Sequence, residues 1–136
     1  MTHDWIWLST EVAEAAHAEQ LAEHGGRTGV RDAAALENAM SRAQELALRG
    51  ETYWATLAAA YGFGIVRNQP FIDGNTRTAA VVMEAFMVIN GCTLRANDAE
   101  LVVAIQSLAE GELDEQELAD WLVIRPASLN KRRLKR

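Results

Sequence analysis

The sequence predicts an all-α fold, with a single domain of six helices arranged around a central apolar helix. Three observations lead to this class. Apolar residues recur at helical spacing along most of the chain. Capping residues and glycines divide it at intervals typical of short helices. Finally, residues 79–89 contain one strongly polar side chain, Glu84, as expected for a helix that is buried nearly all round.

Caps and glycines delimit the first two helices. Ser9 or Thr10 is a suitable N-cap for a helix that runs to about His24, where two glycines follow. Asp32 can cap the second helix, which Gly50 ends. Its apolar positions fall at helical spacing, namely Leu36, Ala39, Met40, Ala43, Leu46 and Ala47.

The other four helices follow from the same signals. Thr52 is expected to open the third, and the central apolar helix spans about residues 77–90. Asp98 is expected to cap the fifth. Asp114 and Glu117 form a variant of the capping box at the start of the sixth. One apolar face of the third helix carries Trp54, Leu57, Ala58, Tyr61 and Ile65.

Composition and length favour one cytoplasmic domain. The chain has 136 residues, of which 49% are hydrophobic, so it can bury a sizeable core and is not disordered. We expect the domain to cover residues 1–126. Cys92 is the only cysteine, which excludes an internal disulfide. No stretch is apolar enough for a membrane span, and no signal peptide pattern is present, so a cytoplasmic location is expected.

The charge is unevenly distributed. The net charge is −6, but residues 127–136 hold 5 of the 13 basic residues, which leaves 8 basic against 19 acidic residues in the rest. An acidic body argues against nucleic-acid binding. Residues 127–136 are expected to form a basic, disordered tail. Binding of the tail to nucleic acid or to an acidic surface is the weaker alternative.

Residues 68–78 read Asn-Gln-Pro-Phe-Ile-Asp-Gly-Asn-Thr-Arg-Thr and have a chemical interpretation of their own. A glycine-containing turn that opens a helix presents unpaired N–H groups to an anion such as phosphate. Arg77 adds a planar set of donors, and Asp73 can bind Mg²⁺. Asn75 can bond a phosphate or brace the loop. The alternative is an ordinary turn between helices, with Arg77 as a surface residue.

This stretch resembles the signature of the Fic/Doc family, written His-Pro-Phe-x-Asp/Glu-Gly-Asn-x-Arg. The first position differs, since Gln69 stands where the signature has the histidine that serves as general base. Thr76 stands where Doc-type chains usually have lysine and Fic-type chains glycine. The matching residues are Pro70, Phe71, Asp73, Gly74, Asn75 and Arg77.

The resemblance implies a compact six-helix Fic/Doc-like bundle that uses ATP and Mg²⁺. Asp73 would hold the Mg²⁺, and phosphates would be bound by Gly74, Asn75, Thr76 and Arg77. A glutamine amide at the catalytic position of Gln69 cannot accept a proton near neutral pH, and loss of a general base typically costs ~10²–10⁴-fold. The three histidines, His3, His17 and His24, are all far from Gln69 in sequence, and only His24 is a conceivable substitute.

A second stretch, Gly25-Gly26-Arg27-Thr28-Gly29-Val30-Arg31-Asp32, is similar to Doc-type members. The resemblance implies a short flap near residues 25–31 that holds a target segment in extended form through Arg27, Thr28, Gly29 and Val30. Backbone hydrogen bonds of an added strand would supply the affinity. The alternative is a loop that ends in the helix cap at Asp32.

The chain resembles Doc more closely than the adenylyl-transferring Fic branch, because Ala80 stands where that branch usually has a second arginine. The resemblance therefore implies a Doc-like toxin of a toxin–antitoxin system, which transfers a phosphoryl group from ATP to a hydroxyl of translation elongation factor Tu. Gln69 would leave it inactive or impaired. The expected partner is a small antitoxin whose tail folds on binding. The alternatives are a non-catalytic binding module, or pseudoenzyme, and an adenylyl transferase of the Fic type.

Overall fold

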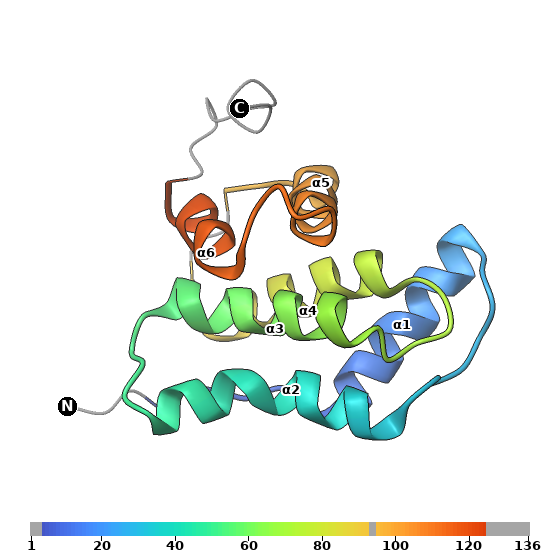
Figure 1. Ribbon diagram of the computed structural model, residues 1–136, viewed down its shortest axis with the longest axis horizontal. Helices are drawn as coiled ribbons and strands as arrows, with labels where there is room; N and C mark the ends of the chain where they lie inside the picture. The colour runs from blue at the N-terminus through green and yellow to red at the C-terminus, as the bar shows by residue number, and fades with distance from the viewer. Residues whose placement is uncertain (1–3, 93–94, 125–136) are drawn as a thin grey trace.

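The computed structural model describes residues 4–92 and 95–124, and these form six α-helices (Figure 1). The all-α class and the number of helices are therefore confirmed. The tail predicted for residues 127–136 lies outside the described residues. The helices are α1 Thr10–His24, α2 Ala33–Leu48, α3 Trp54–Asn68, α4 Asn75–Ile89, α5 Asp98–Ala109 and α6 Glu115–Ile124.

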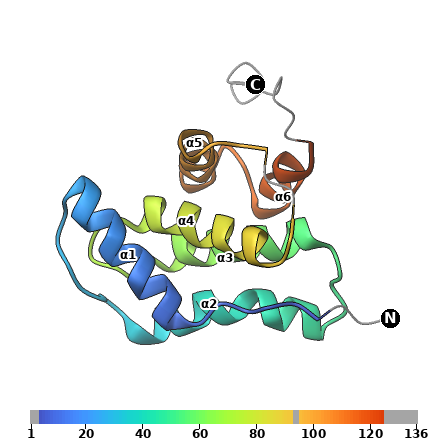
Figure 2. The same ribbon diagram turned by 180° about the vertical axis from the view of Figure 1, so that it is seen from behind.

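Helices α3 and α4 form the middle of the molecule. Both views place α5 and α6 on one side of this pair and α2 on the other (Figures 1 and 2). The most extensive packing joins α2 to α3 and α3 to α4, while α1 packs on α4. Among the helices of residues 4–92 and 95–124, none combines the length and the apolar character that crossing a membrane requires.

Two of the predicted caps are confirmed. Asp32 Oδ1 accepts a hydrogen bond of 3.0 Å from the Ala35 N–H at the start of α2. Asp114 and Glu117 form the expected reciprocal pair, with distances of 2.8 and 2.9 Å between each carboxylate and the other residue's N–H. These caps depend only on residues three positions apart, so the sequence is sufficient to predict them.

Two other helix starts were predicted wrongly. Asn97, not Asp98, caps α5, because the Asn97 side chain and Glu100 bond each other's backbone N–H in a capping box. The third helix begins at Trp54 rather than at Thr52. There the carboxylate of Glu51 accepts from the next two N–H groups, which holds the chain in a turn before the helix starts.

The central helix α4 begins at Asn75, two residues earlier than predicted, and most of its length is buried. Val82, Met83 and Phe86 are fully enclosed. The expectation of burial nearly all round is wrong for the last turn, where Val88 is 60% exposed and Ile89 is 50% exposed. Hydrophobic composition predicted the buried turns but could not show that the end of the helix leaves the core.

Helices α2 and α3 approach most closely at Gly64. A Cβ added there would lie 2.8 Å from the Ala39 carbonyl oxygen and 3.0 Å from Ala39 Cα. Because these are backbone atoms, the two helices would have to move apart. We expect Gly64→Ala to destabilise the fold, because overpacking usually costs roughly 1–3 kcal/mol. The higher helix propensity of alanine offsets up to about 1 kcal/mol of this cost. Urea denaturation measures the difference.

Gly62→Ala is the matched control on the same helix. A Cβ at Gly62 would meet Ile105 Cδ1 at 2.8 Å and Met83 Sδ at 3.2 Å, which are ends of flexible side chains that can rotate away. We therefore expect a smaller loss of stability than at Gly64. A loss at Gly62 equal to or larger than that at Gly64 would contradict the close helix approach as the cause.

Candidate functional site

The predicted site lies on the motif loop, residues 69–74, which joins α3 to α4. Its first residue, Gln69, caps the C-terminus of α3 in the left-handed region, with φ of 48°. The Gln69 side chain turns back on the loop. Its Nε2 donates to the Val66 carbonyl at 2.8 Å, and its Oε1 accepts from Asn75 Nδ2 at 3.3 Å. The amide is thus held between the end of α3 and the start of α4.

Asn75, the first residue of α4, braces the loop from inside. Asn75 is 7% exposed. Oδ1 accepts from the Phe71 N–H at 3.0 Å, while Nδ2 donates to the Phe71 carbonyl at 2.9 Å and to Gln69. Both hydrogens of the amide are therefore in use. The sequence left two roles open for this side chain, binding a phosphate or bracing the loop. Its contacts are those of a brace.

The flap, residues 25–31, is pinned along the motif loop. Val30 pairs with Phe71 in an antiparallel bridge, and the Ile72 N–H donates to the Gly29 carbonyl at 3.1 Å. Gly29 has φ of 119°, and a Cβ there would lie 3.1 Å from the Ile72 side chain, so only glycine fits comfortably. Thr28 is exposed. The predicted flap thus lies directly against the predicted site.

Arg31 is a residue of this arrangement to which sequence reasoning gave no role. Its N–H donates to the Pro70 carbonyl at 2.6 Å. Its guanidinium donates to the backbone carbonyls of Gln69, at 2.9 Å from Nε, and of Asn68, at 3.1 Å. A cation at the C-terminus of a helix satisfies its last carbonyls. No local signal could reveal this, since Arg31 and Gln69 are 38 positions apart.

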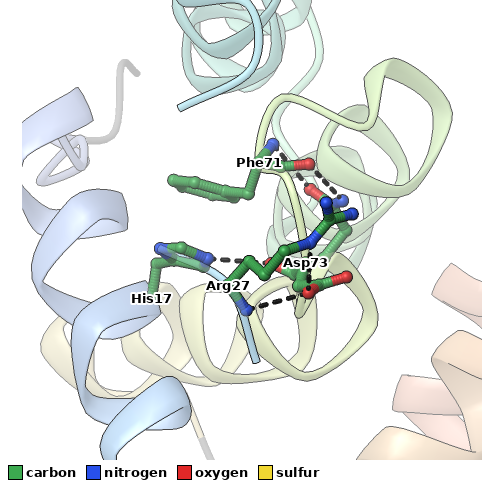
Figure 3. Close-up of polar contacts among 5 residues, drawn as sticks. His17, Arg27, Phe71 and Asp73 are labelled. Carbon is green, nitrogen blue, oxygen red and sulfur yellow. Dashed lines mark hydrogen bonds and ion pairs between the residues drawn. The ribbon is translucent and has the colours of Figure 1, made fainter. Parts of the chain in front are cut away.

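Asp73 is held by the flap residue Arg27 (Figure 3). Asp73 Oδ2 accepts from the Arg27 N–H at 2.8 Å and lies 3.5 Å from Arg27 Nε. The hydrogen bond from the Arg27 N–H, helped by the nearby guanidinium, holds the pKa of the Asp73 carboxyl below its usual range. The carboxylate is therefore ionised at neutral pH and suited to bind a cation.

A pocket of about 380 Å³ opens between the motif loop, α1 and α5. Helix α4 starts here, and its first backbone N–H groups have no acceptor within the helix. Together with the positive end of the helix dipole, they favour an anion. The sequence-predicted residues that line the pocket are Gln69, Asp73, Gly74, Asn75, Thr76 and Arg77, whereas the flap residues Arg27 to Val30 do not line it.

Arg77 and His24 meet at the edge of this pocket. Arg77 is exposed, and its Nη1 lies 3.4 Å from His24 Nε2. The same imidazole nitrogen lies 2.9 Å from Glu23 Oε1. Since a guanidinium only donates and a carboxylate only accepts, Nε2 can serve one of these partners at a time. The predicted phosphate ligand and the one conceivable substitute base thus share the pocket with Gln69.

The pocket continues into a second one of about 430 Å³ between α1, α4 and α5. Its lining carries three carboxylates, those of Glu23, Glu84 and Asp98, against one guanidinium, that of Arg77; the apolar lining residues are Ala80, Val81, Ala99, Leu101 and Val102. Burial, and then the neighbouring charge and hydrogen bond of Asp98, raise the pKa of the Glu84 carboxyl. This groove is thus both acidic and lined with apolar side chains.

We expect Glu84→Gln to stabilise the fold at neutral pH. A raised pKa means that the folded state disfavours ionised Glu84, so ionisation costs stability as the pH rises through the carboxyl range. The gain should be absent at acidic pH, where Glu84 is protonated in both states, and should grow toward neutral pH. Thermal denaturation at several pH values measures it. A gain that does not depend on pH would contradict this cause.

The residues present fit a Mg²⁺ ion only if a ligand brings further oxygens. Within residues 4–92 and 95–124, no three His, Cys, Asp or Glu side chains gather as a metal site. Asp73 offers a single ionised carboxylate next to the start of α4. Mg²⁺ is commonly bound by one or two carboxylates together with substrate phosphates. The donor set thus suits a metal that arrives with a phosphorylated ligand.

One comparison with known proteins identifies a family. No curated protein matches the chain. The model of the family described as Fic/DOC matches residues 7–87. The match spans more than half of the chain and includes the flap, the whole motif loop and most of α4. The chain therefore belongs to the Fic/DOC family.

Proposed function

We propose that this chain binds ATP with Mg²⁺ in the pocket at the start of α4, and that it is a Doc-like protein whose phosphoryl transfer is inactive or impaired. The family generally uses a nucleotide substrate. The observation that carries the proposal is the convergence of three features on one pocket: the N-terminus of α4, the exposed guanidinium of Arg77 and the ionised carboxylate of Asp73.

Each residue has a role in this proposal. Arg77 and the first N–H groups of α4, around Gly74 and Thr76, bind phosphate oxygens. Asp73 would hold a Mg²⁺ ion, which would supply charge neutralisation for the transferred group. Asn75 keeps the loop in shape through its bonds to Phe71. These residues position the nucleotide and neutralise its charge, which is most of what phosphoryl transfer requires of a protein. Nucleotide binding can therefore persist even where transfer does not occur.

The step that this chain lacks is proton removal. As the target hydroxyl oxygen bonds to phosphorus, its proton must leave, and the bond from phosphorus to the departing nucleotide breaks. The amide of Gln69 cannot take that proton, and its Nε2 is bonded to the Val66 carbonyl. We therefore propose that phosphoryl transfer by this chain is slow or absent. The proposed target is a hydroxyl of translation elongation factor Tu, and the proposed location is the cytoplasm.

A non-catalytic binding module is the second candidate, and the same amide favours it. Gln69 is bonded to Val66 and to Asn75, so this side chain serves the loop and has no evident task in chemistry. Adenylyl transfer of the Fic type is the third candidate. In adenylyl transfer the bond that breaks is one to the α-phosphorus of ATP, whereas in phosphoryl transfer it is one to the γ-phosphorus.

The position of a radioactive label separates these candidates. The protein is incubated with elongation factor Tu and with ATP labelled in either the γ- or the α-phosphate. Slow transfer of the γ label alone supports the Doc-like assignment, and transfer of the α label alone supports adenylyl transfer. Binding of ATP with neither transfer, even in the Gln69→His variant, supports the binding module and contradicts the transferase.

We further propose a protein partner, a small antitoxin whose tail folds into the acidic groove between α1, α4 and α5. The carboxylates of Glu23, Glu84 and Asp98, together with the apolar residues of the same lining, suit a basic helix with one apolar face. Folding on binding costs roughly 2–5 kcal/mol, so apolar anchors should contribute more than charge.

Co-expression with the product of the neighbouring upstream gene, followed by size-exclusion chromatography, tests this partner. We expect a stable complex that also forms with Gln69→His, because that side chain is not a docking group. A monomer of 15.0 kDa that elutes without a copurifying peptide, at micromolar concentrations of both proteins, would rule out this partner.

A further inference from the structure

His17 is a buried polar side chain that the proposed chemistry does not use. It lies on the inner face of α1, between the buried residues Ala13 and Leu21, and only 5% of it is exposed. Burial of a polar group costs free energy unless the group finds a hydrogen-bond partner. His17 is also far from the site in sequence, 56 positions before Asp73. Its contacts therefore call for an explanation.

His17 contacts Phe71 and Asp73 of the motif loop (Figure 3). Its Nε2 lies 2.8 Å from the Asp73 carbonyl oxygen. Since a carbonyl oxygen can only accept, Nε2 carries the hydrogen and donates it. The imidazole stacks on the Phe71 ring, with the centroids 4.0 Å apart and the planes 9° apart. It also lies against Gly74, where an added Cβ would be 3.7 Å from the imidazole Cδ2.

Asp73 is consequently held at both ends. The bond from His17 fixes its backbone carbonyl to α1, and the bond from the Arg27 N–H fixes its carboxylate to the flap. Figure 3 shows the two contacts reaching Asp73 from different segments. Mg²⁺ demands a near-ideal arrangement of oxygens, so a ligand to it must be positioned closely.

We infer that His17 is a positioning residue, which sets the orientation of the Asp73 carboxylate for a nucleotide-bound divalent cation through the backbone of the motif loop. This inference rests on the proposed function, since it assumes that Asp73 binds the metal. His17 touches neither nucleotide nor metal in this role. Because it acts through Asp73, which binds the metal, its effect on ATP binding should appear only when the divalent cation is present.

The test compares two substitutions by calorimetry with ATP, in Mg²⁺ and in EDTA. His17→Phe keeps an aromatic ring for the stack on Phe71 but lacks the donor. We expect it to weaken Mg²⁺–ATP binding about 10- to 100-fold, the range for residues that orient metal ligands, with ATP binding in EDTA unchanged. His17→Gln keeps an N–H donor and should recover part of the loss. Urea denaturation checks that both variants fold.

An Asp73→Asn background provides the control. If His17 acts through the Asp73 carboxylate, His17→Phe should have little further effect there. Equal weakening with and without Mg²⁺, or no rescue by His17→Gln, would overturn the inference and leave a purely structural role. Mg²⁺-dependent ATP binding that is unchanged by His17→Phe would overturn the inference about His17 and leave the proposed function standing. Absence of any Mg²⁺-dependent ATP binding in the unsubstituted protein would overturn the proposed function and this inference together.

Discussion

Gln69→His should raise phosphoryl transfer by roughly 10²–10⁴-fold, the contribution of a positioned general base. An imidazole with a pKa near neutrality can accept the proton of the target hydroxyl. The left-handed conformation at position 69, with φ of 48°, does not prevent the change, because histidine is among the residues enriched there. Initial rates of γ-label transfer to elongation factor Tu measure the gain, and growth arrest on expression provides a second readout.

Gln69→Asn is the matched control for this prediction. Asparagine also tolerates a positive φ, and its amide cannot accept a proton near neutral pH. It should therefore give no gain. A rise of the same size in both variants would show that loss of the Gln69 contacts to Val66 and Asn75, rather than a new base, is responsible. No rise in the histidine variant would favour the binding module.

Arg77→Ala should weaken ATP binding by about 1.5–3 kcal/mol, the range for hydrogen bonds to charged groups. Stability should change little, because Arg77 is exposed and lies in the first turn of α4, outside the core. Calorimetry gives the affinity and urea denaturation gives the stability. The prediction depends on the guanidinium contacting phosphate rather than remaining with His24.

Arg67→Ala is a suitable comparison. Arg67 is also an exposed arginine, but it lies over the Phe63 ring and lines a different pocket. Its removal should leave ATP affinity unchanged while lowering the positive charge by the same amount. Equal losses in the two variants would point to the overall field of the protein. Unchanged affinity in Arg77→Ala would contradict the assignment of this side chain as a phosphate ligand.

The sequence predicted those parts of the fold that depend on near neighbours. The caps at Asp32 and at Asp114 with Glu117 each need only residues three positions apart. The start of α5 was misplaced because Asn97 and Asp98 are both good caps, and only the bond to Glu100 decides between them. The exposure of Val88 depends on how far the neighbouring helices extend, and the spacing of apolar residues does not reveal that extent.

The sequence predicted which motif residues form the candidate site, but it did not reveal which residues support them. His17 and Arg27 reach Asp73 across 56 and 46 positions, and Arg31 reaches Gln69 across 38. Each is an ordinary residue in its local context, a histidine in a helix or an arginine in a glycine-rich loop. Only the packing of α1 and the flap against the motif loop gives these side chains their partners.

Calorimetry shows whether the pocket at the start of α4 binds ATP together with Mg²⁺. We expect saturable binding at one site, tighter in Mg²⁺ than in EDTA. The Mg²⁺-dependent part should be lost in Asp73→Asn, and binding should weaken in Arg77→Ala under both conditions. ATP binding that is undetectable at millimolar concentrations, or that is the same in Mg²⁺ and EDTA and insensitive to both substitutions, would contradict this expectation.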